Sequence, residues 1–79
     1  MELRQAVEKR LNLLSLPFWT LRDVEYYTGR SRNVCEKKIQ EVRAGDSTLP
    51  ARAVRPEQIL KAFGLELESE VRRLRCLIQ

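Results

Sequence analysis

Three polar residues in the middle of the chain recur at spacings of four and three: Asn33, Lys37 and Gln40. In an α-helix this spacing places all three near one face. Asparagine and glutamine amides can bond bidentately to adenine, and a lysine can reach the acceptor atoms of guanine. The three residues therefore have the chemistry to read base edges in double-stranded DNA. Any solvent-facing helix can carry the same residue types, so a plain exposed surface is the alternative interpretation.

Basic residues surround these three side chains and dominate the charge of the chain. Residues 30–55 contain seven basic and three acidic residues, a net charge of +4 that equals the net charge of the whole chain. A basic stretch confined to one unit is expected of a nucleic-acid binder, because each phosphate contact releases condensed counterions. The predicted contacts to the DNA backbone are Arg30, Arg32, Arg43, Arg52 and Arg55.

The composition of the chain argues against most enzymes and against metal sites. Histidine, the commonest general acid-base residue at neutral pH, is absent. The only two cysteines, Cys35 and Cys76, form no C-x-x-C motif, so a zinc site has too few ligands. The three glycines are isolated, which leaves no glycine-rich phosphate loop. We therefore expect no enzymatic activity, no cofactor and no bound metal.

The length and hydrophobic balance of the chain predict a single small domain over residues 1–79. The chain is 43% hydrophobic and 33% charged, the balance of a soluble globular domain. No apolar stretch approaches the roughly 18 residues of a membrane helix, and no signal-peptide pattern begins the chain. We expect a cytoplasmic, all-α protein of about five short helices with at most a vestigial β wing.

Hydrophobic periodicity predicts a first helix over about residues 2–14. Its apolar stripe consists of Leu3, Val7, Leu11 and Leu14. Pro17 follows, and the residue before a proline is disfavoured in the helical conformation, so the helix ends ahead of it. Phe18 and Trp19 come next, and both are expected in the core because a small domain needs its large side chains inside.

Residues 20–44 have the pattern of a helix-turn-helix unit. Thr20 is a good N-cap for a short helix that Gly29 ends. Ser31 then caps a longer helix over about residues 32–44. The buried side of this longer helix is formed by Cys35, Ile39 and Val42. The second helix of such a unit enters the major groove of DNA, which makes 32–44 the predicted recognition helix.

The remaining residues predict a loop and two more helices. Residues 46–55 have no helical period and contain Pro50, which predicts a loop with at most a short extended piece. Pro56 suits the first turn of a fourth helix. A left-handed residue is expected to close the helices at Gly29, Gly45 and Gly64.

The C-terminal segment, residues 65–79, predicts an amphipathic helix. Its apolar stripe consists of Leu67, Val71, Leu74 and Ile78. This stripe can pack on the rest of the domain, or it can pair with a second copy to form a homodimer. Packing within the chain is favoured because the core is otherwise thin.

A further pattern spans roughly residues 19–63. It consists of Thr20, Leu21, Asp23, Val24, Tyr27, Thr28, Gly29, Ser31, Arg32, Cys35, Ile39, Leu49, Pro50 and Arg52. The pattern resembles the small excisionase-like and MerR-like helix-turn-helix domains of phages and other mobile elements. The resemblance implies double-stranded DNA as the partner and a β-hairpin wing after the Leu-Pro turn. Residues 51–55 contain no glycine and leave little room for a hairpin, so we expect a truncated wing with Arg52 and Arg55 on an extended strap.

The predicted function is therefore sequence-specific binding of double-stranded DNA by a small transcriptional regulator or an excisionase-type accessory factor. The alternative is a protein-interaction module, such as a phage-type inhibitor or adaptor, that presents its basic face to an acidic partner protein. Neither interpretation involves a membrane.

Overall fold

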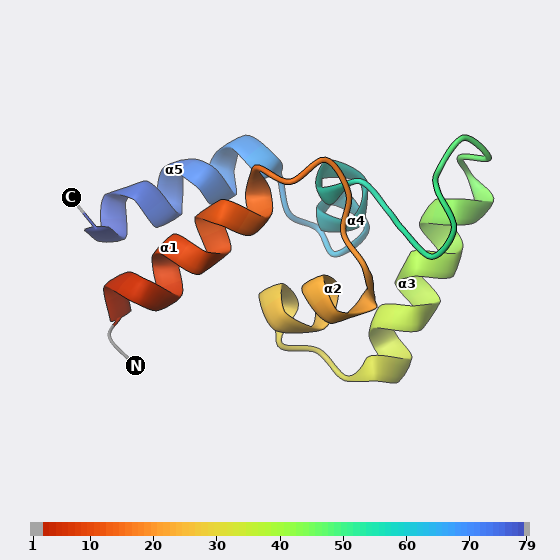
Figure 1. The fold of residues 1–79 in the computed structure, drawn as a ribbon, viewed down its shortest axis with the longest axis horizontal. Helices are drawn as coiled ribbons and strands as arrows, with labels where there is room; N and C mark the ends of the chain where they lie inside the picture. Colours follow the sequence, from red (N-terminus) through yellow and green to blue (C-terminus); the bar gives the residue numbers. More distant parts are fainter. Residues whose placement is uncertain (1–2, 79) are drawn as a thin grey trace.

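The computed structural model describes residues 3–78 and has an all-α fold (Figure 1). Its helices are α1 (Leu3–Leu14), α2 (Leu21–Thr28), α3 (Arg32–Ala44), α4 (Pro56–Ala62) and α5 (Leu67–Ile78). No strand forms within the described residues, where a single antiparallel bridge joins Trp19 to Val54. The predicted fold class is confirmed, and each predicted helix is present.

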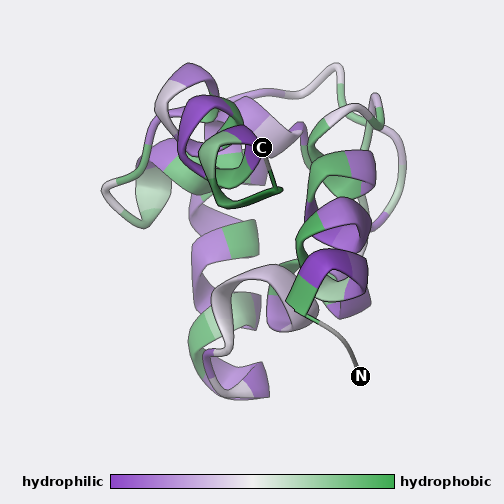
Figure 2. Ribbon diagram, turned by 90° about the vertical axis from the view of Figure 1, so that its left-hand side faces the viewer, coloured by the Kyte–Doolittle hydropathy of each residue, from purple (hydrophilic) through white to green (hydrophobic). Residues whose placement is uncertain are grey.

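The terminal helices α1 and α5 lie side by side in opposite directions (Figure 1). Hydrophilic and hydrophobic segments alternate along the helices, as expected of amphipathic elements (Figure 2). Val7, Leu14 and Leu74 are buried members of the core, and the other stripe residues of α5 pack against it. The stripe on α5 therefore packs within the chain. Leu3, the first residue of the apolar stripe on α1, is 68% exposed and does not join the core.

The core is centred on Trp19, which is fully buried together with Val24 and Val54. The indole N–H of Trp19 donates to the carbonyl of Leu13 at 2.6 Å, which satisfies its polar atom. The neighbouring Phe18 is 37% exposed, so the prediction that both aromatic residues lie in the core was wrong for Phe18. The chain is extended here, and successive side chains of an extended segment point to opposite sides.

Helices α2 and α3 begin at the predicted capping residues. The backbone N–H of Thr20 donates to Asp23 Oδ2 at 2.9 Å, and Ser31 Oγ accepts from the backbone N–H of Val34 at 3.4 Å. Gly29 ends α2 with a φ of 68°, a left-handed conformation that disfavours other residues. The two helices pack against each other across the short turn that follows, which gives the predicted helix-turn-helix order.

The three glycines do not all act alike. Gly64 has a φ of 80°, so it is left-handed, as Gly29 is and as predicted. Gly45 has a φ of −88°, which contradicts the prediction of a left-handed residue there. Helix α3 ends instead with the N–H of Gly45 donating to the carbonyl of Val42 at 3.2 Å, a tightened last turn that needs no positive φ.

A buried polar contact joins α2 to α5. The Tyr27 hydroxyl donates to Glu70 Oε1 at 2.7 Å, and Arg73 Nη2 donates to the same oxygen at 3.1 Å. Glu70 is only 7% exposed. The hydrogen bond from Arg73, helped by that from Tyr27, lowers the pKa of Glu70 even though burial acts in the opposite direction. Burial and the adjacent carboxylate raise the pKa of Tyr27, so this residue stays a neutral donor.

Candidate nucleic-acid interface

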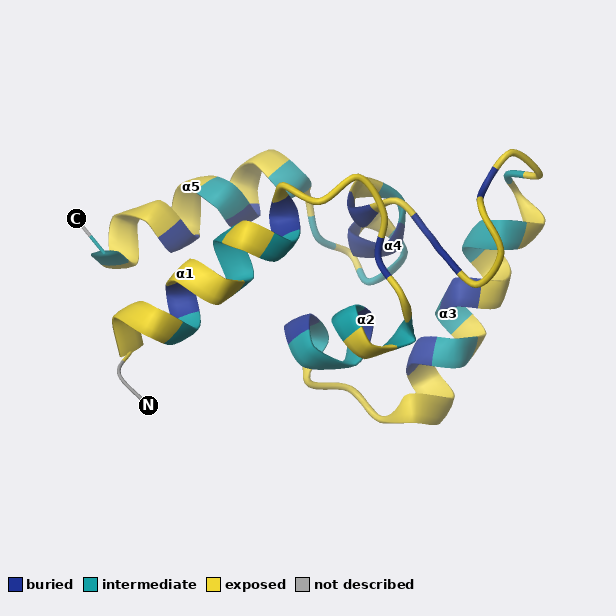
Figure 3. Ribbon diagram, in the orientation of Figure 1, coloured by how far each residue is buried: buried dark blue, intermediate teal, exposed yellow. Residues whose placement is uncertain are grey.

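The outward face of α3 carries the three residues predicted to read bases. Asn33, Lys37 and Gln40 are all exposed, whereas Cys35 and Ile39 on the other side of the helix are buried. Helix α3 lies at one end of the molecule, and exposed segments recur along its length (Figure 3). The structure thus brings the three predicted residues together on one solvent-facing surface, which we call the α3 crest.

A groove runs beside the α3 crest, between α3, the start of α2 and the loop before α4. It has a volume of about 930 Å³ and is lined by Thr20, Leu21, Arg22, Arg32, Glu36, Ile39, Gln40, Arg43, Ala51 and Arg52. Four of these residues are arginines and one is acidic, so we call it the arginine groove. Gln40 belongs to both surfaces, which shows that the crest and the groove are continuous.

The structure divides the five predicted backbone contacts into two groups. Arg32, Arg43 and Arg52 come together in the arginine groove. Arg30 and Arg55 are exposed but lie outside it, Arg30 in the turn before α3 and Arg55 immediately before α4. A phosphate backbone that follows the groove would therefore meet the first group, and the other two would act at its margins.

Ion pairs within α3 neutralise part of the positive charge. Arg32 Nε lies 3.0 Å from Glu36 Oε1, and Lys38 Nζ lies 3.6 Å from Glu41 Oε2. Surface pairs of this kind contribute about 0 to 1 kcal/mol, so they can open for a stronger partner such as a phosphate. Lys37 has no ion-pair partner in the part of the chain that the structure describes. Its ammonium group is therefore available to a ligand.

Arg43 also has a structural task that the sequence did not indicate. Its Nη1 donates to the backbone carbonyls of Pro50 and Ala53, the latter at 2.8 Å. These bonds hold the loop of residues 45–55 against the end of α3. A guanidinium has five N–H groups, so the remaining ones can still reach a phosphate. Arg43 is thus a loop anchor first, and its contact to the DNA backbone stays a prediction.

Asp46 fixes the start of the same loop. Its carboxylate accepts from the backbone N–H of Thr48 at 2.9 Å and from Gln58 Nε2 of α4 at 3.0 Å. The hydrogen bond that the Thr48 hydroxyl donates to Asp46 Oδ1, followed by those from Gln58 and from the Thr48 backbone, lowers the pKa of Asp46 to about 2. The loop is therefore tied to α4 as well as to α3.

Arg52 occupies a turn position that ordinarily favours glycine. The N–H of Ala53 donates to the carbonyl of Pro50 at 3.2 Å, and Arg52 inside this turn has a φ of 60°. A left-handed conformation costs a non-glycine residue about 1–2 kcal/mol. Glycine would adopt this conformation at lower cost than arginine does. The predicted extended strap was therefore wrong at Arg52, whereas Arg55 is extended, with a ψ of 140°.

Two residues beside the α3 crest were not among the predicted contacts. Arg22 of α2 lines the arginine groove, although it belongs to a segment with no net charge. Val34, in the first turn of α3, is 40% exposed, and an exposed apolar side chain there can contact the methyl group of thymine. The signal for Val34 was its place outside the buried stripe of α3. No local signal pointed to Arg22, because its role depends on how α2 packs on α3.

Comparisons with protein-family models, curated proteins and solved structures found no significant match to this chain. Within residues 3–78, no three side chains of histidine, cysteine, aspartate or glutamate come together as a metal site would require. None of the helices in that range is long and apolar enough to cross a bilayer. The chemistry of the α3 crest and the arginine groove is therefore the basis for a functional proposal.

Proposed function

We propose that this protein binds double-stranded DNA in a sequence-specific manner, with α3 in the major groove. The observation that carries the proposal is the position of the α3 crest beside the arginine groove, which joins hydrogen-bonding groups for bases to cations for phosphates. Helix α3 has 13 residues, about 20 Å at 1.5 Å per residue, and a B-DNA major groove about 12 Å wide admits such a helix.

Base reading is assigned to the first three turns of α3. Asn33 and Gln40 offer amides for adenine, and the exposed Lys37 lies between them with an ammonium group for guanine acceptors. Val34 adds an apolar contact suited to a thymine methyl group. In helix-turn-helix proteins the N-terminal residues of the recognition helix contact base edges, which matches the positions of Asn33 and Val34.

Backbone contacts are assigned to the arginines around the crest. Arg22, Arg32 and Arg52 line the groove and can follow one phosphate strand, and Arg30 and Arg55 flank it. The left-handed backbone of Arg52 supports this role, because glycine would suit the turn better but would supply no cation.

The biological role proposed with this binding is that of a small transcriptional regulator or an excisionase-type accessory factor. The supporting features are the helix-turn-helix order and the capped α2 and α3, whereas the lack of a β-hairpin after Pro50 departs from the wing of that family. A homodimer on two half-sites would have to use a surface other than the α5 stripe, because that stripe packs against the chain's own core.

The test is the salt dependence of binding to a labelled duplex of random sequence, measured by fluorescence anisotropy between about 50 and 200 mM salt. Each neutralised phosphate adds about 0.9 to the slope of log affinity against log salt concentration. Contacts from the groove arginines predict a slope of several units. If the protein does not bind the duplex even at the lowest salt, the proposal is wrong. The basic face would then be assigned to an acidic protein partner, and a pull-down would be the next experiment.

A further inference from the structure

A second group of cations lies further along α2, around Tyr26. Lys9 Nζ of α1 is 4.4 Å from the centre of the Tyr26 ring, and the Arg10 guanidinium carbon is 5.4 Å from it. An aromatic ring attracts a cation at these distances through its quadrupole. One tyrosine of α2 therefore contacts two adjacent cations of α1, and we call these three residues the Tyr26 cluster.

The cations of the Tyr26 cluster take part in no ion pair within residues 3–78. Neither Lys9 nor Arg10 has an ion pair there, and the nearby Glu8 is paired with Arg4, with 3.1 Å between Arg4 Nε and Glu8 Oε1. Two like charges that share one ring repel each other, and a bound anion relieves that repulsion. The cluster is thus a surface suited to a polyanion.

The cluster also continues the arginine groove. Arg22 and Tyr26 are four residues apart on α2, so they lie on the same face, opposite the buried Val24 and Tyr27. Arg22 lines the arginine groove at one end of this face, and Tyr26 carries Lys9 and Arg10 at the other. The cations therefore form a track from the loop before α4, across α2, to α1.

We propose that Lys9 and Arg10, positioned by Tyr26, bind phosphates of a DNA strand that leaves the arginine groove and passes over α2. This inference rests on the proposed function and extends its footprint to α1. The first helix of a helix-turn-helix unit crosses the DNA backbone. In this protein that helix is α2, and the Tyr26 cluster adds phosphate contacts from α1 on the same strand. These phosphate contacts add affinity and fix the position of the protein along the duplex, but they do not read bases.

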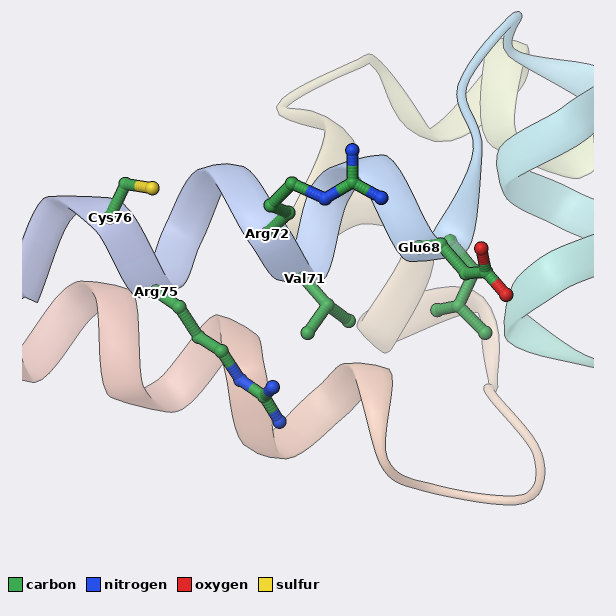
Figure 4. Close-up of a pocket in the computed structure, with 6 residues that line it drawn as sticks. Glu68, Val71, Arg72, Arg75 and Cys76 are labelled. Atoms are coloured by element: carbon green, nitrogen blue, oxygen red, sulfur yellow. The ribbon is translucent and has the colours of Figure 1, made fainter.

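The experiment compares two double variants that remove the same charge. Lys9→Gln with Arg10→Gln removes the cluster cations, and Arg72→Gln with Arg75→Gln removes two exposed arginines of α5 as the control. Arg72 and Arg75 line a shallow hollow on α5 and have no ion pair within the described residues (Figure 4). Both double variants are measured by anisotropy against one duplex over about 50–200 mM salt.

Loss of two phosphate contacts should lower the salt slope of the cluster variant by about 1.8 relative to wild type. The α5 variant should keep a slope within the error of wild type. Equal slopes in the cluster variant and wild type would overturn this inference and leave the proposed function intact. Equal reductions in both variants would overturn it too, because net charge alone would then explain the effect. Absence of any binding by wild type would refute the proposed function and this inference together.

Tyr26 is assigned as a positioning residue, and two substitutions test that role. Tyr26→Phe keeps the aromatic face and should keep the wild-type slope. Tyr26→Leu keeps an apolar side chain without a quadrupole and should lower the slope toward that of the cluster variant. A reduced slope in Tyr26→Phe would overturn the positioning role, because the aromatic face would then not be what orients the cations.

Discussion

Substitution of Glu70 by alanine tests whether the buried contact between α2 and α5 holds the two halves of the molecule together. Glu70 accepts from the Tyr27 hydroxyl at 2.7 Å and from Arg73 Nη2 at 3.1 Å. The α2 side of this contact lies within the helix-turn-helix unit, and the α5 side lies in the terminal helix pair. Its loss should therefore destabilise the whole fold.

The expected magnitude follows from the burial of each partner. Without the carboxylate, the buried Tyr27 hydroxyl loses its acceptor, which costs about 1–3 kcal/mol. The side chain of Arg73 is 56% exposed and can return to water, so the lost ion pair adds at most about 1 kcal/mol. We expect Glu70→Ala to lower the free energy of unfolding by about 2–3 kcal/mol.

The assay is urea unfolding followed by the fluorescence of Trp19, the single tryptophan, which is fully buried. For a small domain the free energy changes by about 1 kcal/mol per molar urea, so the midpoint should fall by roughly 2 M. The matched control is Glu68→Ala on the exposed side of α5, which should stay within about 0.5 kcal/mol of wild type. A loss in Glu70→Ala no larger than in Glu68→Ala would refute the reasoning.

Three further predictions address pH, the loop and base contacts. The pKa of Glu70 is lowered in the folded protein, so its contribution to stability is present above the usual glutamate range near about pH 4 and is lost as the pH falls below it. The urea midpoints of wild type and Glu70→Gln should therefore converge at low pH, and a constant difference would contradict this. Arg52→Gly should keep the free energy of unfolding within about 1 kcal/mol while lowering the salt slope of DNA binding by about 0.9; a wild-type slope would exclude a phosphate contact. Replacing one thymine of a preferred duplex by uracil should weaken the binding of wild type about fourfold, because the contact with one buried methyl group is lost. The same replacement should not change the binding of Val34→Ala. The same response in both proteins at every thymine would remove Val34 from the interface.

The local features of the fold could be predicted from the sequence because each depends on neighbouring residues. Thr20 and Ser31 act as caps, and Gly29 adopts its left-handed turn, through hydrogen bonds and torsions within a few residues. The buried stripe of α3 follows from helical periodicity alone. The exposed positions of Asn33 and Lys37 follow from the same periodicity.

The features that the sequence did not predict depend on tertiary proximity. Tyr27 and Glu70 are 43 residues apart in the chain, and no local pattern pairs them. Arg22 joins the arginine groove only because α2 packs on α3, and Lys9 reaches the Tyr26 ring only because α1 packs on α2. The net charge of segments of the sequence therefore did not identify the cations that the fold brings to the basic surface.

The most direct test of the central claim is a comparison of Lys37→Ala with wild type on two duplexes at one salt concentration. One duplex is selected from a random pool by wild type, and the other is unrelated to it. If the α3 crest reads bases, the substitution should weaken binding to the selected duplex by about 1–3 kcal/mol and change binding to the unrelated duplex much less. Equal weakening of both duplexes, or a selection that enriches no sequence, would contradict base reading by α3.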